Sequence, residues 1–240
     1  MADHNTSHHG HGHVHDFDAD RARRYDQMAR RTLPGYEELH TMASSLLGVE
    51  LDEHARVLVV GAGTGMELLT VAQQHPHWQL TGIDPSGEML AVARERLQEH
   101  SLSERVQLHV GQIYDLPETD QYDAAMCLLV IHHLPVEEQR RLLQQIAQRL
   151  KKGAPFVVAE MIGDTASSQF RRFLAAWKLR QMVFGTPVNE IEERAQTLSS
   201  VVSFASEESL RSLLASAGFL DMERFFTAYF YGGWTTHLSL

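Results

Sequence analysis

The sequence is poor in cysteine and in long apolar runs. Cys127 is the single cysteine among 240 residues, which excludes an intramolecular disulfide, a cysteine-based metal cage and a dithiol redox motif. Its place in the apolar run AAMCLLVI predicts burial. No apolar run approaches the roughly 18 to 20 residues that span a bilayer, and the N-terminus is His-rich where a secretory signal needs an apolar core. These absences predict a cytoplasmic protein without a membrane-spanning segment.

Basic residues are also in deficit. Lysine and arginine number 21 against 31 aspartate and glutamate residues, which gives a formal net charge of −10. Because nucleic-acid affinity is largely built from lysine and arginine that neutralise phosphates, this balance favours a small-molecule partner over direct nucleic-acid binding. The content of 43% hydrophobic and 22% charged residues is that of an ordinary globular protein.

The chain is expected to form one domain, residues 17–240, after a disordered His-rich tail, residues 1–16. A length of 240 residues fits a single α/β domain. The tail holds six of the fifteen histidines and almost nothing that could pack. It is either a solvated segment or a binder of zinc or nickel, and no pattern in it positions a catalytic metal.

Helical and strand patterns alternate along the chain. Residues 18–47 are expected to be helical with a break at TLPGY, where Pro34 and Gly35 interrupt the helix and Tyr36 starts a second one. Short apolar, β-branched runs predict strands, with helical spacing between them. The expected strands are 56–60, 78–84, 106–113, 122–131 and 155–162, and the expected helices between them include 86–99 and 136–150. This alternation predicts right-handed βαβ units and an open, mostly parallel α/β sheet of the Rossmann-like kind.

The pattern changes after the fifth strand. We expect helices over 164–200 and 206–217, and two antiparallel strands that complete a seven-stranded sheet, one on either side of the last long helix. An i, i+3, i+4, i+7 stripe is formed by Phe170, Phe173, Leu174 and Trp177. The stripe predicts core or dimer packing, with contact of Phe173 or Trp177 to a substrate as the alternative. Segments 18–47 and 164–200 are expected to form a helical cap.

Three glycines follow the first expected strand in VLVVGAGTGMELL, residues 57–69. In an open α/β sheet, ligands bind outside the carboxyl ends of the strands, and this loop lies at that edge. Gly61 and Gly63 are expected to let a ligand approach the main chain, and Gly65 to allow close packing of helix and strand or a tight turn. Asp84 ends the second strand about 20 residues downstream, where a carboxylate can accept two hydrogen bonds from a ribose diol. The alternative role for Asp84 is the N-cap of the next helix, and both roles can coexist.

These two features fit either a dinucleotide or an adenosyl sulfonium cofactor. A dinucleotide needs a helix N-terminus directed at its pyrophosphate. Glu67 follows the last glycine by two residues and would repel phosphate. The ammonium and the positive sulfur of a sulfonium cofactor are compatible with an acidic site, so we expect the sulfonium.

An ordered series of motifs resembles the class I S-adenosylmethionine-dependent methyltransferases. The series is VLVVGAGTG, GIDPSGEML, GQIYDLP, YDAAMCLLVIHHLP, LKKGAPFVVAE and SLLASAGF, within residues 56–219. The resemblance implies a Rossmann-like methyltransferase fold and S-adenosyl-L-methionine as the cofactor. It also implies that Gln112 and Ile113 contact adenine, although the family more often has an acid where Gln112 stands, and that Leu128 lies beneath the methionine moiety. The expected cofactor-binding residues are Tyr36, Gly61, Ala62, Gly63, Gly65, Asp84, Pro85, Gln112, Ile113 and Leu128.

Both ends of the chain are similar to the carboxy-S-adenosylmethionine synthase group of tRNA wobble-uridine modification. RTLPGY resembles that group's RSVPGY, and VNEIEERAQTL resembles its helical insertion. The resemblance implies that Tyr36 closes over the cofactor and that the insertion forms a homodimer contact. The group places an arginine in the insertion to bind the extra carboxylate of its modified cofactor. Here Ala195 stands at that position and Arg194 is one residue away, about 100° around a helix, so we expect ordinary S-adenosylmethionine.

Candidate catalytic residues follow the fourth and fifth strands. His132 and His133 lie at the carboxyl edge, where a neutral imidazole can accept a substrate proton. Glu160 ends the fifth strand, where it can orient a substrate amine or hydroxyl. The alternatives are structural: HHLP caps the strand, and Glu160 makes hydrogen bonds within the fold. Tyr25 and Tyr36 either roof the site or pack between helices.

The sequence as a whole predicts methyl transfer from S-adenosylmethionine to a small-molecule acceptor. A carboxy-S-adenosylmethionine synthase-like enzyme is the first alternative, and it requires a cation such as Arg194 for the extra carboxylate. A non-catalytic S-adenosylmethionine-binding module, responsive to metal through its tail, is the second. The identity of the acceptor does not follow from residue order, because the geometry of the cap sets it.

Overall fold

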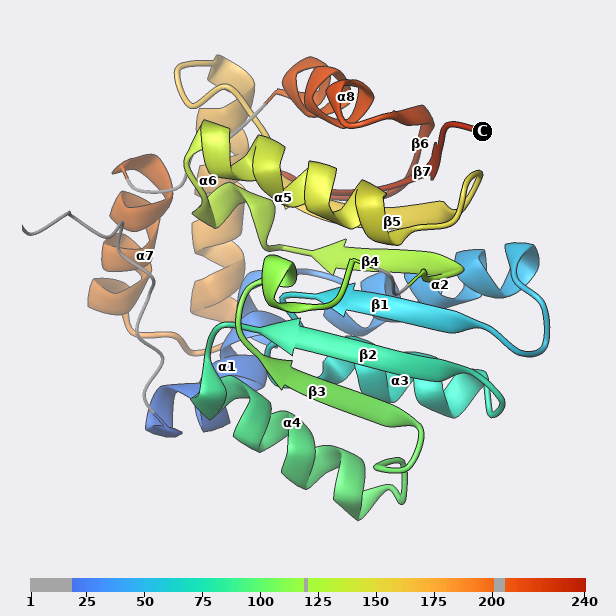
Figure 1. The fold of residues 1–240 in the computed structure, drawn as a ribbon. Helices are drawn as coiled ribbons and strands as arrows, with labels where there is room; N and C mark the ends of the chain where they lie inside the picture. The colour runs from blue at the N-terminus through green and yellow to red at the C-terminus, as the bar shows by residue number, and fades with distance from the viewer. Residues whose placement is uncertain (1–18, 119–120, 201–205) are drawn as a thin grey trace, which may run out of the picture.

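The computed structural model describes residues 19–118, 121–200 and 206–240, and its central element is one seven-stranded sheet (Figure 1). In spatial order the strands are β3 (Val106–Val110), β2 (Gln79–Asp84), β1 (Arg56–Val60), β4 (Ala124–Leu128), β5 (Pro155–Met161), β7 (Tyr231–Leu238) and β6 (Phe219–Ala228). The first five are parallel, whereas β7 is antiparallel to both of its neighbours. The predicted, mostly parallel sheet with an antiparallel C-terminal edge is confirmed.

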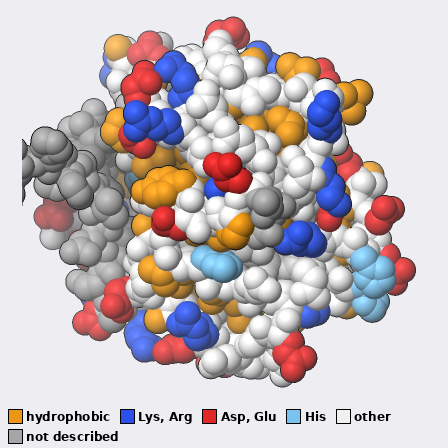
Figure 2. Space-filling model, in the orientation of Figure 1, with side chains coloured by type: hydrophobic (Ala, Val, Ile, Leu, Met, Phe, Trp, Pro, Cys, Tyr) orange, Lys and Arg blue, Asp and Glu red, His pale blue; other side chains and the backbone are white. Residues whose placement is uncertain are grey.

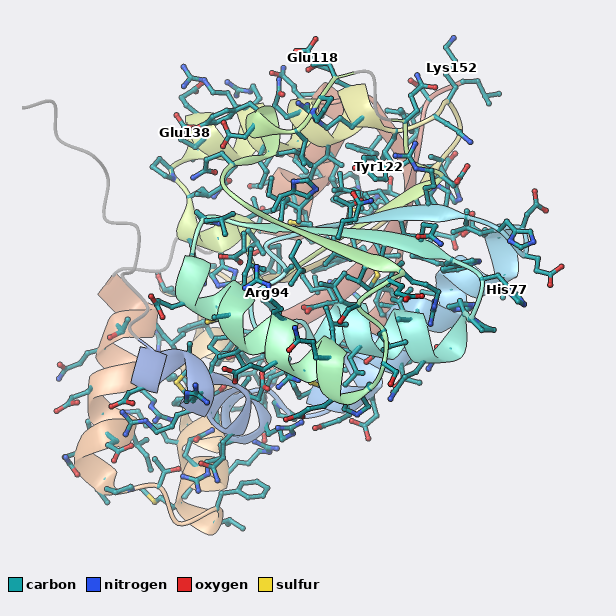
Figure 3. The ribbon with its side chains drawn as sticks, turned by 60° about the horizontal axis from the view of Figure 1, so that its bottom comes forward. His77, Arg94, Glu118, Tyr122, Glu138 and Lys152 are labelled. Carbon is teal, nitrogen blue, oxygen red and sulfur yellow. The ribbon has the colours of Figure 1, made fainter. Side chains whose placement is uncertain are left out.

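Helices cover both faces of this sheet and one of its ends (Figure 1). One face carries α2 (Tyr36–Glu50), α3 (Met66–Gln74) and α4 (Gly87–Glu99), and the other carries α5 (Val136–Arg149) and α8 (Glu207–Ser216). The remaining helices, α1 (Ala19–Thr32), α6 (Ser168–Val183) and α7 (Val188–Ser200), gather at the carboxyl ends of the parallel strands (Figure 3). The labelled His77 and Lys152 lie at the opposite end. Within the described residues, no helix combines the length and the apolar character needed to cross a membrane.

The apolar run of β1 is explained by burial on both faces of the sheet. Val57 and Val59 belong to the core cluster under α2, α3 and α4, whereas Leu58 and Val60 belong to the cluster under α5 and α8. A strand with two buried faces needs apolar residues at every position, because its side chains alternate between the faces. Cys127 of β4 is also fully buried, as predicted, and burial raises the pKa of its thiol.

The helix break at Pro34 and Gly35 is where the sequence predicts it. Gly35 adopts φ 76°, and Tyr36 is the first residue of α2. The aromatic stripe on α6 packs within the chain: Phe170 and Trp177 are buried in the main core cluster, and the Trp177 indole N–H donates a hydrogen bond to the Thr32 carbonyl at 2.8 Å. The prediction of core packing is therefore confirmed, and the bond fixes α6 to the end of α1.

Three predicted boundaries are wrong. Both C-terminal strands follow α8, instead of lying on either side of it, because β6 and β7 form a hairpin and β7 inserts between β6 and β5. β3 ends at Val110, since Gly111 adopts φ 149°, and β4 ends at Leu128, since Leu129 adopts φ 62°. Positive φ breaks the ladder at both places. The predicted tail, residues 1–16, and Phe17 lie outside the described residues.

Candidate functional site

The site lies where the strand order reverses. β1 pairs with β2 on one side and with β4 on the other, so the loops that leave the carboxyl ends of β1 and β4 diverge to opposite faces of the sheet. Such a switch point opens a crevice at the carboxyl edge, where open α/β sheets bind ligands. The glycine loop, Gly61–Gly65, follows β1, and the segment 129–133 follows β4.

The three positions of the loop require glycine for different structural reasons. A Cβ on Gly61 would overlap the Val130 side chain, and a Cβ on Gly65 would stand 2.8 Å from the Ala93 Cβ of α4. Gly65 has the positive φ of the tight turn that is one expectation for it, and its close neighbour is a helix instead of a strand, whereas the expected reason for Gly61 is wrong, because a side chain of the protein fills the space beside it. Gly63 has φ 50°, and its nearest neighbour would be the Met89 methyl at 3.4 Å. Packing therefore does not explain Gly63, whose positive φ favours glycine, and its contact with a ligand stays a prediction.

These different reasons predict unequal losses of stability for Gly61→Ala and Gly63→Ala. Gly61→Ala must displace Val130 from a packed core, so its free energy of unfolding is expected to fall by about 1–3 kcal/mol more than that of Gly63→Ala. Both variants carry the cost of positive φ at a non-glycine residue, about 1–2 kcal/mol. Urea unfolding of the two variants and the parent measures the difference. Equal stability of the two variants would show that Val130 does not explain Gly61.

Asp84 is joined to the glycine loop. Its Oδ2 accepts a hydrogen bond from the Gly63 N–H at 2.9 Å, and its Oδ1 accepts one from the Ser86 N–H at 2.8 Å. Burial raises the pKa of the Asp84 carboxyl above its usual value, and the two N–H donors partly offset this rise. Each oxygen keeps a further lone pair for a ligand hydroxyl. The N-cap of α4 is Ser86, whose hydroxyl accepts from the Met89 N–H, so the alternative role expected of Asp84 belongs to its neighbour.

A polar network fixes α1 above the loop. Asp26 of α1 accepts hydrogen bonds from the Thr64 hydroxyl and the Arg96 guanidinium, and the Tyr36 hydroxyl lies 3.5 Å from the same carboxylate. Arg96 also donates to the Thr64 carbonyl at 2.6 Å. Sequence reasoning missed this network, because Asp26 lies 38 residues from Thr64 and 70 from Arg96, and no local pattern marks a single aspartate in an amphipathic helix.

Two tyrosines of the N-terminal helices lie beside the acidic groups of the site. Burial, and then the carboxylates of Glu67 and Asp26, raise the pKa of both Tyr25 and Tyr36, and Asp84 adds to the rise at Tyr25. Both phenols are therefore neutral and remain hydrogen-bond donors at ordinary pH. Tyr36 belongs to the main core cluster and Tyr25 packs against it, as the alternative of helix packing predicts, so a role in roofing the site stays a prediction.

Glu160 and His132 form a buried pair at the ends of β5 and β4. The Glu160 carboxylate accepts hydrogen bonds from the backbone N–H groups of Ile131 and His132, at 2.7 and 3.0 Å, and lies 2.7 Å from His132 Nδ1. Because an ionised carboxylate only accepts hydrogen bonds, His132 Nδ1 carries the proton, and Nε2 of the neutral ring keeps a lone pair. His133 is exposed, and its ring centroid lies 4.0 Å from that of His132.

The other predicted residues lie along the same edge with different exposures. Ile113, Leu128 and Ala62 are buried, and Ile113 belongs to the core cluster under α5 and α8. Gln112 and Pro85 are exposed. Contact of these five residues with a cofactor stays a prediction. Within the described ranges, no three His, Cys, Asp or Glu side chains come together in a group that could hold a metal ion.

The central part of the chain is similar to a known protein family. Residues 57–153 match a family described as a methyltransferase domain. A carboxy-S-adenosyl-L-methionine synthase of Campylobacter curvus is 25% identical over 215 residues, which cover 90% of this chain and 89% of that protein. A ubiquinone/menaquinone biosynthesis C-methyltransferase of Geobacter sulfurreducens is 27% identical, over 86% of this chain and 80% of that protein.

Solved structures share the fold. An O-methyltransferase family 2 protein from Planctomyces limnophilus, solved with apigenin, has a TM-score of 0.64 and 18% identity, over 93% of this chain and 63% of that chain. The present chain thus spans under two thirds of that protein. Magnesium protoporphyrin IX methyltransferase from Synechocystis, solved with bound S-adenosylmethionine, has a TM-score of 0.60 and 16% identity, over 96% of this chain and 87% of that chain. At these identities the likeness concerns the fold.

Proposed function

Because the chain carries a methyltransferase domain and the fold of S-adenosylmethionine-dependent methyltransferases, we propose that it transfers the methyl group of S-adenosylmethionine to a small-molecule acceptor. The observation that carries this proposal is the contact of Gly63 with Asp84. It places a loop position whose φ of 50° favours glycine beside a carboxylate that can accept hydrogen bonds from a ribose diol. The likeness to enzymes that act on small molecules supports the choice of acceptor class.

The residues at this edge fit the proposed cofactor. Asp84 would hold the ribose, and Gly63 would let the nucleoside lie against the main chain. Tyr25 and Tyr36 would cover the methionine end, beside the carboxylate of Glu67. S-adenosylmethionine supplies an activated methyl group, and the sulfonium loses its positive charge when the methyl leaves. A site lined with carboxylates suits a cationic cofactor, since opposite charges attract in a partly buried setting.

His132 is the proposed base. S-adenosylmethionine would supply the methyl group and be left as S-adenosylhomocysteine, and an acceptor oxygen or nitrogen that receives the methyl group would lose a proton. His132 Nε2 accepts the proton that the acceptor loses, and Glu160 at 2.7 Å from Nδ1 stabilises the resulting imidazolium. Glu160 thus acts through His132, because protein donors already occupy both of its oxygens.

A carboxy-S-adenosylmethionine synthase-like activity is the second candidate, and the curated relatives favour it. Arg194 Nη1 is buried, and it has no hydrogen-bond partner among the described residues. Its other amino group lies 3.2 Å from Glu190 Oε2 on the same helix. Ala195, at the position of the group's carboxylate-binding arginine, is 4% exposed and belongs to the core cluster. Methyl transfer is preferred because a buried methyl group cannot replace that arginine.

Mass spectrometry of the nucleoside released from the purified protein tests both candidates. The proposal predicts S-adenosylmethionine or S-adenosylhomocysteine, together with formation of S-adenosylhomocysteine on incubation with a panel of small-molecule acceptors. Recovery of a nucleoside heavier by one carboxylate would support the second candidate. Tight S-adenosylhomocysteine binding without turnover of any acceptor would leave a non-catalytic binding module.

A cytoplasmic homodimer that acts on a small molecule, without direct nucleic-acid contact, stays a prediction. Exposed apolar side chains gather where α6 passes into α7, the segment expected to form the dimer contact. They are Leu179, Met182, Val183, Phe184 and Val188. On the face drawn in Figure 2, lysine and arginine side chains are interspersed with aspartate and glutamate side chains, a distribution that favours a small molecule over a polyanion. The single domain predicted for residues 17–240 is part of the same proposal.

A further inference from the structure

Glu67 is a carboxylate at the site that the proposed methyl transfer does not use. It is the second residue of α3, directly after the glycine loop, and its side chain is 13% exposed. Its Oε1 lies 3.3 Å from His40 Nε2 of α2. Among the described residues, Glu67 Oε2 receives no hydrogen bond. A carboxylate that is mostly removed from water needs a cation or donors to remain ionised, so one side of Glu67 is open to a ligand.

His40 lies between the Tyr36 carbonyl oxygen and the Glu67 side chain. His40 Nδ1 lies 2.6 Å from the Tyr36 carbonyl oxygen, which can only accept, so Nδ1 carries a proton. Nε2 lies 3.3 Å from Glu67 Oε1. Burial alone would lower the pKa of His40, but the charge of Glu67, its hydrogen bond, the Tyr36 carbonyl and the charge of Glu37 together raise it. The His40 side chain, which is 2% exposed, thus fixes the orientation of Glu67.

The negative charge of Glu67 also influences three other side chains at this edge of the sheet. Its charge contributes to the raised pKa values of Tyr25, Tyr36 and Asp84, which come from three different elements. The charge of Glu67 thus reaches both the residues proposed to cover the methionine end and the residue proposed to hold the ribose. Arg96, the cation of the neighbouring network, is bound to Asp26 and does not neutralise Glu67.

We propose that Glu67 receives the α-ammonium group of the methionine moiety of the cofactor, with His40 as the residue that positions it. This inference rests on the proposed function. It assigns Glu67 Oε2 to a primary ammonium group. It also gives a role to the acidic residue in the first turn of α3. The same charge repels an anionic end such as a pyrophosphate, so Glu67 also selects the class of cofactor.

The test is a cycle of two ligands and two proteins, measured by titration calorimetry. The ligands are S-adenosylhomocysteine and its deaminated analogue, S-(5′-adenosyl)-4-thiobutanoate, which lacks only the ammonium group. In the parent protein the analogue is expected to bind about 10-fold to 100-fold more weakly, the range of a charge-assisted hydrogen bond. In Glu67→Gln the two ligands are expected to bind with nearly equal affinity, because only S-adenosylhomocysteine loses an interaction.

Glu88→Gln is the matched control. Glu88 is also the second residue of a helix at this edge, α4, but it is exposed, so the same change of charge should leave the preference for the ammonium intact. Equal weakening of both ligands by Glu67→Gln would overturn the inference and leave a structural role for Glu67. A parent protein that binds both ligands equally would overturn it without use of any variant. Failure of the parent protein to bind S-adenosylhomocysteine at all would overturn the proposed function itself.

Discussion

Asp84→Ala is expected to weaken S-adenosylhomocysteine binding by about 100-fold or more. The ribose diol would donate two hydrogen bonds to this carboxylate, and bonds to a charged acceptor contribute about 1.5–3 kcal/mol each. The alanine also releases the Gly63 N–H, which Asp84 Oδ2 holds at 2.9 Å, so the glycine loop loses one of its bonds to the end of β2, although its backbone bonds to the Ile83 carbonyl remain. Titration calorimetry gives the affinities of the parent and the variant.

Asp84→Asn separates the charge from the shape of this side chain. The amide keeps one acceptor oxygen, so its affinity should fall between those of the parent and the alanine variant. Acidification adds an independent measurement. Burial raises the pKa of Asp84, and a protonated carboxyl accepts fewer hydrogen bonds, so affinity in the parent should decline with falling pH before an ordinary aspartate would titrate. The Asn variant should lack this decline. Full affinity in Asp84→Ala would contradict the assignment of the ribose site.

Local sequence patterns predict those parts of the site that lie within one strand and the turn that follows it. β1 is apolar at successive positions because both faces are buried, and the glycines follow it directly. Asp84 could be predicted because the carboxyl ends of neighbouring parallel strands meet at one edge. The break at Gly35 has a local cause too, since its φ of 76° suits glycine. In each case the determining residues are close in sequence.

Partners brought together only by the fold could not be predicted. Val130 lies beside Gly61 because β4 is placed next to β1, and the sequence alone does not reveal that neighbour. His40 contacts Glu67 across two packed helices. The sequence predicts for Glu160 either contact with a substrate or hydrogen bonds within the fold, and only the register of β5 with β4, which brings it under the turn at His132, decides for the second. The order of β6 and β7 in the sheet likewise depends on which strand of their hairpin pairs with β5.

The largest effect on turnover is expected for His132→Ala. Removal of a positioned base lowers the rate by about 10²- to 10⁴-fold. The affinity for S-adenosylhomocysteine should change little, because the proposed cofactor contacts lie on the loop after β1 and at the end of β2. The expected result is therefore a low kcat with an unchanged KM for S-adenosylmethionine, measured as S-adenosylhomocysteine release with an acceptor found in the panel. Glu160→Gln should also lower kcat, because an amide oxygen can accept from Nδ1 without stabilising the imidazolium by charge, while the amide NH₂ group faces the Ile131 N–H, which is itself a donor.

His77→Ala is the control for the loss of an imidazole. His77 lies at the opposite end of the sheet (Figure 3) and is exposed, so its removal should leave kcat within about twofold, since surface substitutions away from a site have small effects. His133→Ala distinguishes the two adjacent histidines, because Glu160 orients only His132. Loss of cofactor affinity in His132→Ala, in step with kcat, would indicate that the pair serves only to hold the loop after β4. Retention of the parent kcat would instead show that the acceptor loses its proton to another group, and the roles of His132 and Glu160 would then be structural.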